Sequence, residues 1–113
     1  MANLSGDLDT VFHALSDPTR RAVMRRLVRS PASVTELAAP FEMALPSFLK
    51  HLAVLEEGGL ISSTKAGRVR RCRLRATGLA AAEGWLGDQR RLWERRSDRL
   101  AQYVELRLTR EGR

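Results

Sequence analysis

The sequence predicts a small, mainly helical domain with one β-hairpin, and three observations lead to this fold class. The chain has 113 residues, which is enough for one domain and too few for two. Apolar residues recur at helical spacing along most of the chain, but from residue 60 to residue 74 they alternate with polar residues, as in β-strands. Before that point, residues 33–59 have the form of two short helices joined by a tight turn. We therefore expect residues 1–113 to form a single domain.

The composition favours an anionic partner and excludes several classes of protein. Lys and Arg number 20 against 13 Asp and Glu, a formal net charge of +7, and such an excess favours a nucleic acid or an anionic surface. No apolar run approaches the roughly 18 residues that cross a membrane, and the N-terminus shows no signal-sequence pattern. The single cysteine excludes an internal disulfide and a cysteine-rich zinc module. We expect a soluble, cytoplasmic protein without a membrane partner.

Two amphipathic helices are expected at the start of the chain. In residues 7–15 the apolar residues at helical spacing are Leu8, Val11, Phe12 and Leu15. Asp17 then caps a second helix, residues 18–28, with Pro18 at its first position. The side chains expected inside are Ala22, Val23, Leu27 and Val28. The polar face carries Arg20, Arg21, Arg25, Arg26 and Arg29, and it is either solvated or in contact with phosphates.

The helix-turn-helix is expected at residues 33–59. Ser33 can cap its first helix, since Glu36 three residues later completes a capping box. Pro40 ends this helix, because proline lacks the backbone donor and clashes with the preceding turn. The second helix ends at Gly58-Gly59, where a left-handed cap is expected.

The second helix of this motif is amphipathic, and its outer face is small and basic. At about 100° per residue, the inward residues are Leu45, Phe48, Leu52, Leu55 and Gly59. The opposite face has no acidic residue before Glu56, so it suits either an ordinary surface helix or a helix in the major groove of DNA. The residues that we predict to bind DNA from this helix are Pro46, Ser47, Leu49, Lys50 and His51. His51, at the edge of the face, either packs or touches a phosphate.

A basic hairpin is expected directly after the helix-turn-helix. Strands at residues 60–65 and 68–74 flank the turn signal Ala66-Gly67, with Cys72 expected to be a buried structural thiol. No acidic residue lies between Gly58 and Ala82, while Lys65 and five arginines crowd residues 65–75. Such crowding needs either full solvation or a polyanion. A helix-turn-helix followed by such a hairpin, or wing (residues 60–75), is a winged helix. The wing residues that we predict to bind DNA are Lys65, Arg68, Arg70 and Arg71.

The last helix, residues 77–108, carries more apolar surface than one thin domain can cover. Apolar residues recur in it every seven positions, and it holds both tryptophans and the only tyrosine. We therefore expect a partner helix from a second subunit, with residues 1–15 at the same interface. The residues predicted at this homodimer interface are Leu8, Val11, Phe12, Leu79, Leu86, Trp93 and Leu100.

Three blocks of the sequence occur together: ALSDPTR at residues 14–20, VTEL at 34–37 and KHLAVLEEGGL at 50–60. In combination they resemble the ArsR/SmtB family of bacterial winged-helix transcriptional regulators, over roughly residues 8–105. The last helix is similar to the subgroup often encoded beside small START-like (SRPBCC) proteins. The resemblance implies homodimers that bind a double-stranded DNA operator, usually repress, and release the DNA when an effector binds.

Two positions depart from the family pattern, which often has serine at both. Ala44 forfeits a side-chain cap worth about 1 kcal/mol, and Leu49 offers apolar contact with thymine methyls in place of a hydrogen bond. The metal-sensing members carry a Cys-x-Cys pair where this sequence has TELA at residues 35–38, or histidines on the last helix, which has none here. We therefore expect no metal site and no cofactor.

Other functions compete with this prediction. An enzyme is disfavoured, because His13 and His51 have no evident nucleophile or acid partner, and no catalytic residue is predicted. A nonspecific architectural DNA-binding protein would use the same basic wing, and binding to random against operator-bearing DNA separates the two. A protein-interaction module would use the Trp-rich helix instead.

Overall fold

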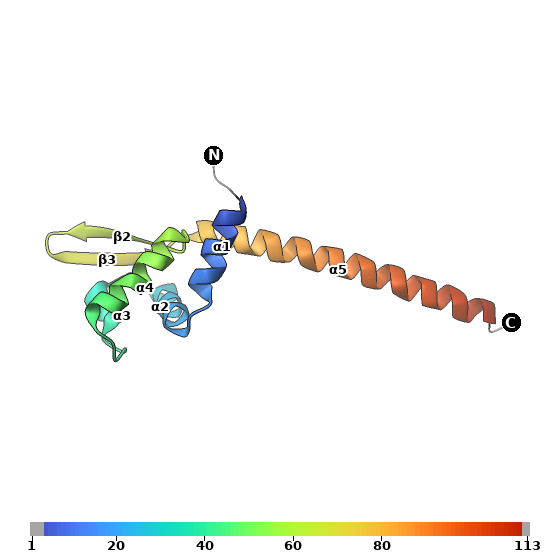
Figure 1. The fold of residues 1–113 in the computed structure, drawn as a ribbon, viewed down its shortest axis with the longest axis horizontal. Helices are drawn as coiled ribbons and strands as arrows, with labels where there is room; N and C mark the ends of the chain where they lie inside the picture. The colour runs from blue at the N-terminus through green and yellow to red at the C-terminus, as the bar shows by residue number, and fades with distance from the viewer. Residues whose placement is uncertain (1–3, 112–113) are drawn as a thin grey trace. The chain divides into compact units, whose positions relative to one another are not determined.

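A computed structural model describes residues 4–111 of the chain and confirms the mainly helical fold with a small sheet. Residues 1–3 and 112–113 lie outside the described residues. The elements in order are α1 (Leu4–Leu15), α2 (Pro18–Arg29), β1 (Ala32–Ser33), α3 (Val34–Ala38), α4 (Leu45–Glu57), β2 (Ile61–Ala66), β3 (Val69–Leu74) and α5 (Ala76–Glu111) (Figure 1). Within residues 4–111, no helix combines the length and the apolar character needed to cross a membrane.

The chain forms two compact units, at residues 1–82 and 83–113. The first unit contains every element from α1 to β3 and the first turns of α5. In the second unit, the described residues 83–111 are the remainder of α5, which is one uninterrupted helix.

Helix α2 begins where the sequence predicts and buries Val23 and Leu27 as predicted, but its buried face is rotated away from Val28 and toward Arg20. Asp17 caps it, since its Oδ2 accepts a hydrogen bond of 3.1 Å from the backbone N–H of Arg20. Val28, predicted inside, is 71% exposed, and Arg20, predicted outside, is only 7% exposed. The buried side chains are Arg20, Val23, Met24 and Leu27, which are three or four residues apart and share one face. The helix is turned toward Arg20 because that guanidinium finds acceptors inside the unit.

Arg20 donates hydrogen bonds to the free carbonyl groups at the C-terminal end of α1. Its Nε donates to the carbonyl oxygen of Ala14 at 2.8 Å, and its Nη2 donates to that of His13 at 2.9 Å. The last carbonyls of a helix have no partner within the helix and favour a positive charge nearby. Arg20 therefore closes α1 and fixes the corner between α1 and α2.

The helix-turn-helix has the predicted caps. Ser33 and Glu36 form a capping box: the Ser33 Oγ accepts from the Glu36 N–H at 3.1 Å, and the Ser33 N–H donates back to the carboxylate at 3.4 Å. At the end of α4, Gly59 has a φ of +68°. The N–H groups of Gly59 and Leu60 return to the carbonyls of Glu56 and Leu55, which is a Schellman cap.

Helix α4 buries Phe48, Leu52 and Leu55, as predicted. Leu45, predicted with them, is instead 53% exposed. The reason is that Phe41, from the loop before the helix, stacks on Phe48 with 5.6 Å between ring centroids and covers this end of the core.

The sheet is larger than the predicted hairpin, and its turn lies one residue further along. All pairings are antiparallel, in the order β1-β3-β2, and Ala66 pairs with Val69. The turn is therefore Gly67-Arg68 and not Ala66-Gly67. Gly67 has a φ of +63°, a conformation that suits glycine at the first position of a two-residue hairpin turn. The two-residue strand β1 was not predicted, because two residues show no periodicity.

Cys72 is buried in the core, as predicted. It belongs to one core cluster with residues from α1 to α5 and from the sheet, among them Val11, Val23, Leu37, Phe48, Leu55, Leu60 and Ile61. Burial raises the pKa of the Cys72 thiol, and the charge of Glu56 raises it further. The side chain is therefore a neutral packing group.

Helix α5 changes character along its length. In the first unit Leu79 and Ala82 pack on the core. In residues 83–110 the large apolar side chains are exposed, and Trp93 is 67% exposed. They are Trp85, Leu86, Leu92, Trp93, Leu100, Tyr103, Val104, Leu106 and Leu108, which we call the α5 stripe.

Two glycine substitutions test how closely the start of α5 approaches the end of α4. A Cβ at Gly78 would lie 2.2 Å from the carbonyl oxygen of Gly58, whereas a Cβ at Gly84 would meet nothing within 4 Å. We expect Gly78→Ala to lower the free energy of unfolding by about 1–3 kcal/mol through overpacking. Gly84→Ala, the matched control, should leave it unchanged or raise it by up to about 1 kcal/mol. Thermal unfolding followed by circular dichroism measures both, and equal effects would contradict the close approach at Gly78.

Candidate nucleic-acid interface

The outer face of α4 is open to solvent. The predicted residues Pro46, Ser47, Leu49 and Lys50 are all exposed. Pro46 is accommodated in the first turn, and Ala44 makes no side-chain cap bond, as its missing hydroxyl requires. The outer face of α4 therefore carries short side chains and a single lysine, Lys50.

His51 differs from the four residues before it, because its ring is half-buried. Its Nδ1 lies 2.9 Å from Nη1 of Arg20 and 3.8 Å from Oδ2 of Asp17. Burial raises the pKa of Asp17, but hydrogen bonds from the backbone N–H groups of Arg20 and Thr19 and the charge of Arg20 outweigh this effect and hold the pKa below its usual value. The ring therefore packs at a junction of charged groups inside the unit.

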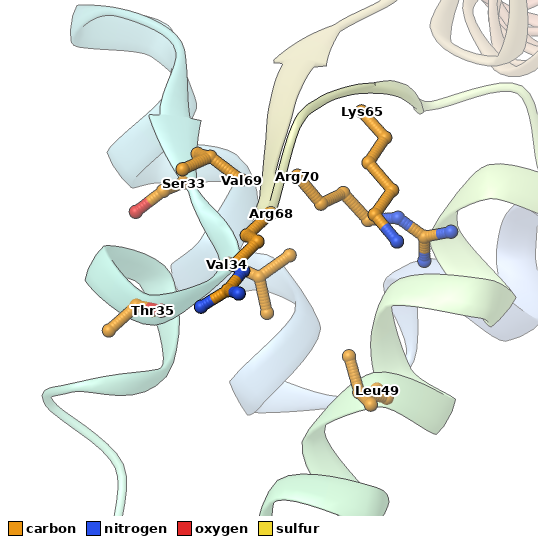
Figure 2. Close-up of a pocket in the computed structure, with 8 residues that line it drawn as sticks. All are labelled: Ser33, Val34, Thr35, Leu49, Lys65, Arg68, Val69 and Arg70. Atoms are coloured by element: carbon orange, nitrogen blue, oxygen red, sulfur yellow. The ribbon is translucent and has the colours of Figure 1, made fainter.

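A groove of about 360 Å³ separates the hairpin from α3 and α4. Figure 2 shows Lys65 and Arg70 reaching from the hairpin toward α4, where Leu49 lies, and Arg68 on the side of α3. The groove is lined by Ser33, Val34, Thr35, Leu49, Lys65, Arg68, Val69 and Arg70. Four of the predicted DNA-binding residues therefore share one concave surface.

The cations of this surface are not neutralised within the chain. Among the side chains of residues 8–110, Lys50, Lys65, Arg68 and Arg70 form no hydrogen bond or ion pair. The ion pairs of the described residues lie elsewhere, between α2 and α3 and along α5. An array of unpaired positive charges in a concave surface raises the local concentration of anions.

Arg71 lies apart from this groove. Strand residues alternate in direction, so Arg71 faces away from Cys72, on the exposed side of the sheet, opposite Ser33 of β1. Hydrogen bonds from Ser33 lower the pKa of Glu36, and the charge of Arg71 contributes to this shift. The structure thus places Lys65, Arg68 and Arg70 among the residues that line the groove, and Arg71 is not one of them.

The sequence did not indicate Ser33, Val34 and Thr35 as part of the surface. They line the groove because the hairpin lies over the start of α3, and β1 pairs with β3. No local signal could have found them, since the strand that brings them there is only two residues long.

No set of three or more His, Cys, Asp or Glu side chains in the described part of the chain is arranged to hold a metal ion. The chemistry available at the groove is therefore that of ammonium, guanidinium and hydroxyl groups beside one apolar side chain. Such groups bind phosphates and base edges.

The helix-turn-helix domain family matches residues 15–64. Over 97 residues the chain is 37% identical to the HTH-type transcriptional regulator Rv2034 of Mycobacterium tuberculosis, covering 86% of this chain and 88% of that protein. It is 30% identical over 79 residues to the transcriptional repressor SdpR of Bacillus subtilis, covering 70% of this chain and 88% of SdpR.

The fold has close counterparts among solved structures. The crystal structure of the ArsR family transcriptional regulator RHA00566 superposes with a TM-score of 0.78 at 53% identity, covering 83% of this chain and 97% of that one. The chain therefore belongs to the ArsR family of winged helix-turn-helix transcriptional regulators.

Proposed function

We propose that this ArsR family regulator binds a two-fold symmetric DNA operator as a homodimer and represses the genes that it controls. As a member of this family it is a sequence-specific DNA-binding protein and not an enzyme. The observation that carries the proposal is the groove of unpaired cations beside the exposed face of α4.

Helix α4 is proposed to enter the major groove. Its exposed residues are small enough to approach base edges, and Lys50 can donate to guanine O6 and N7. Leu49 is proposed to contact thymine methyl groups, while Pro46 and Ser47 lie at the helix start, next to the backbone.

The hairpin is proposed to bind the sugar-phosphate backbone. Lys65, Arg68 and Arg70 bring three positive charges to the groove beside α4, and none of them forms an ion pair with residues 8–110. Arg71, on the exposed side of the sheet, is proposed to contact a phosphate further along. Contacts of this kind position the protein and make its affinity depend on salt.

The α5 stripe is proposed to be covered by a second copy of this chain. Nine large apolar side chains are exposed on 83–110 alone, an area that a soluble domain does not leave open. From the predicted interface, Leu79, Leu86, Trp93 and Leu100 of α5 are proposed to take part, with Leu8 and Phe12 of α1. Val11 is 2% exposed and lies in the core of its own chain, so we do not include it.

Repression follows from this geometry. A two-fold dimer presents two α4 helices to half-sites one DNA turn, about 34 Å, apart, and a dimer on an operator blocks the access of other proteins. SdpR, one of the relatives, is a repressor. We further propose that an effector, still unidentified, releases the DNA. The alternative is a nonspecific architectural protein, for which the face of α4 would carry no sequence information.

Selection of bound sequences from random duplex DNA tests the proposed function. We expect the wild type to select a palindromic sequence at physiological salt. Lys50→Ala should change the ranking of operator variants, since a good base contact discriminates by about 1–3 kcal/mol. Lys65→Ala, the matched control on the wing, should weaken all variants alike. A wild type that selects no sequence would support the architectural alternative.

The salt dependence of binding tests the hairpin. For Arg70→Ala, the slope of log Kd against log salt should fall by about one unit, because one phosphate contact is lost. Arg95→Ala removes the same charge from α5, on the side opposite Trp93, and should keep the wild-type slope. Fluorescence anisotropy with the selected duplex at several salt concentrations measures both. An unchanged slope for Arg70→Ala would make the hairpin a solvated surface.

Sedimentation equilibrium across micromolar concentrations tests the dimer. Trp93 touches little within its own chain, so its truncation has a large effect only where a partner covers it. We expect a dimeric wild type, and Trp93→Ala to weaken association by about 3 kcal/mol or more, with Arg95→Ala as control. A monomeric wild type that binds a palindromic site tightly would refute this interface.

A further inference from the structure

We infer that His51 is a positioning residue for the recognition helix and not a DNA contact: through its Nδ1 it locks α4 to the buried guanidinium of Arg20. The inference rests on the proposed function, because it concerns the helix that is proposed to read DNA. The sequence prediction includes His51 among the DNA-binding residues but leaves open that it packs instead, and the inference takes this second alternative.

The Arg20 guanidinium makes three hydrogen bonds, which together form this lock. Arg20 donates from Nε to the Ala14 carbonyl at 2.8 Å, from Nη2 to the His13 carbonyl at 2.9 Å, and from Nη1 to His51 at 2.9 Å. The first two hydrogen bonds hold the end of α1, and Arg20 itself belongs to α2. Only the third hydrogen bond reaches α4, so His51 is where the recognition helix joins this junction.

The chemistry of the third hydrogen bond determines the protonation of the ring. A guanidinium group has N–H donors and no acceptor, so Nδ1 of His51 must accept the hydrogen bond. The ring is then neutral, with its proton on Nε2. The carboxylate of Asp17, 3.8 Å from Nδ1, is too far for a hydrogen bond; its role is to offset the charge of Arg20, whose backbone N–H it also caps.

This contact governs the orientation of the reading face. Lys50 and Leu49 precede His51 directly, so the rotation of α4 about its axis that places His51 on Arg20 also directs Lys50 outward and Leu49 toward the groove. Without the contact, α4 populates other rotations. The operator affinity then falls in proportion to the fraction of molecules that keep the competent orientation.

Two amide substitutions separate a positioning role from a DNA contact. The carbonyl oxygen of Asn lies near the position of Nδ1 of histidine, so His51→Asn keeps an acceptor for Arg20. The amide of Gln reaches the position of Nε2, so His51→Gln keeps a polar group toward solvent and loses the acceptor at Nδ1. If Nδ1 positions α4, His51→Asn should keep the operator affinity. If Nε2 contacts DNA, His51→Gln should keep it.

The experiment measures binding of the full-length wild type, His51→Asn, His51→Gln and His51→Ala to the selected operator duplex and to a random duplex. We expect His51→Gln and His51→Ala to lose about tenfold in operator affinity, the usual effect of losing a hydrogen bond to a charged group. His51→Asn should stay within about threefold of the wild type. The salt slope should be the same for all four, because no phosphate contact is removed. Circular dichroism at the assay temperature verifies that each variant is folded.

Three results would overturn the inference. They are wild-type affinity for His51→Gln with loss for His51→Asn, equal affinity for all variants, and a salt slope lowered by about one unit in His51→Ala. The failure of the proposed function looks different, because the wild type would then bind operator and random duplex alike. In that case thermal unfolding tests the contact between His51 and Arg20, and His51→Asn should unfold at a higher temperature than His51→Gln.

Discussion

The buried guanidinium of Arg20 is the interaction on which the arrangement of the first unit depends. A charge enclosed in a small domain is tolerated only when its donors are used and a counter-charge is near. Two donors of Arg20 close the end of α1, one holds His51 of α4, and Asp17 supplies the negative charge. The helices α1, α2 and α4 thereby share one set of hydrogen bonds, which opposes the rotation of any one of them alone.

The recognition helix is held at its far end by backbone contacts of a different kind. The Schellman cap at Gly59 turns the chain from α4 into the sheet. The N–H of Gly78 then donates to the Gly59 carbonyl at 3.0 Å, which anchors the start of α5 directly to this cap. Helix α4 is therefore fixed by a side-chain junction along its length and by a glycine contact at its end. A binding surface built on such a fixed element keeps its geometry without a ligand.

Two surfaces of the protein remain open to solvent, and each calls for a different kind of partner. The groove beside α4 collects positive charges that form no ion pair with residues 8–110. The α5 stripe exposes large apolar side chains to solvent. A polyanion satisfies the first and a second copy of the chain satisfies the second, so the proposed function unites them: dimerisation sets the spacing at which two grooves meet one DNA molecule.

The sequence by itself determined the features that depend on a few neighbouring residues. The capping box at Ser33, the glycine cap after α4, the extent of α5 and the inward direction of Cys72 all follow from local hydrogen bonding or periodicity, and the structure confirms them. Only the tertiary structure decided that the buried face of α2 includes Arg20 and leaves Val28 exposed, because the acceptors of Arg20 lie on α1 and on a helix 31 residues away. It likewise decided that the hairpin covers α3, since a two-residue strand has no pattern of its own. Local chemistry specifies where elements begin and end, whereas their rotation and neighbours depend on partners that are distant in the chain.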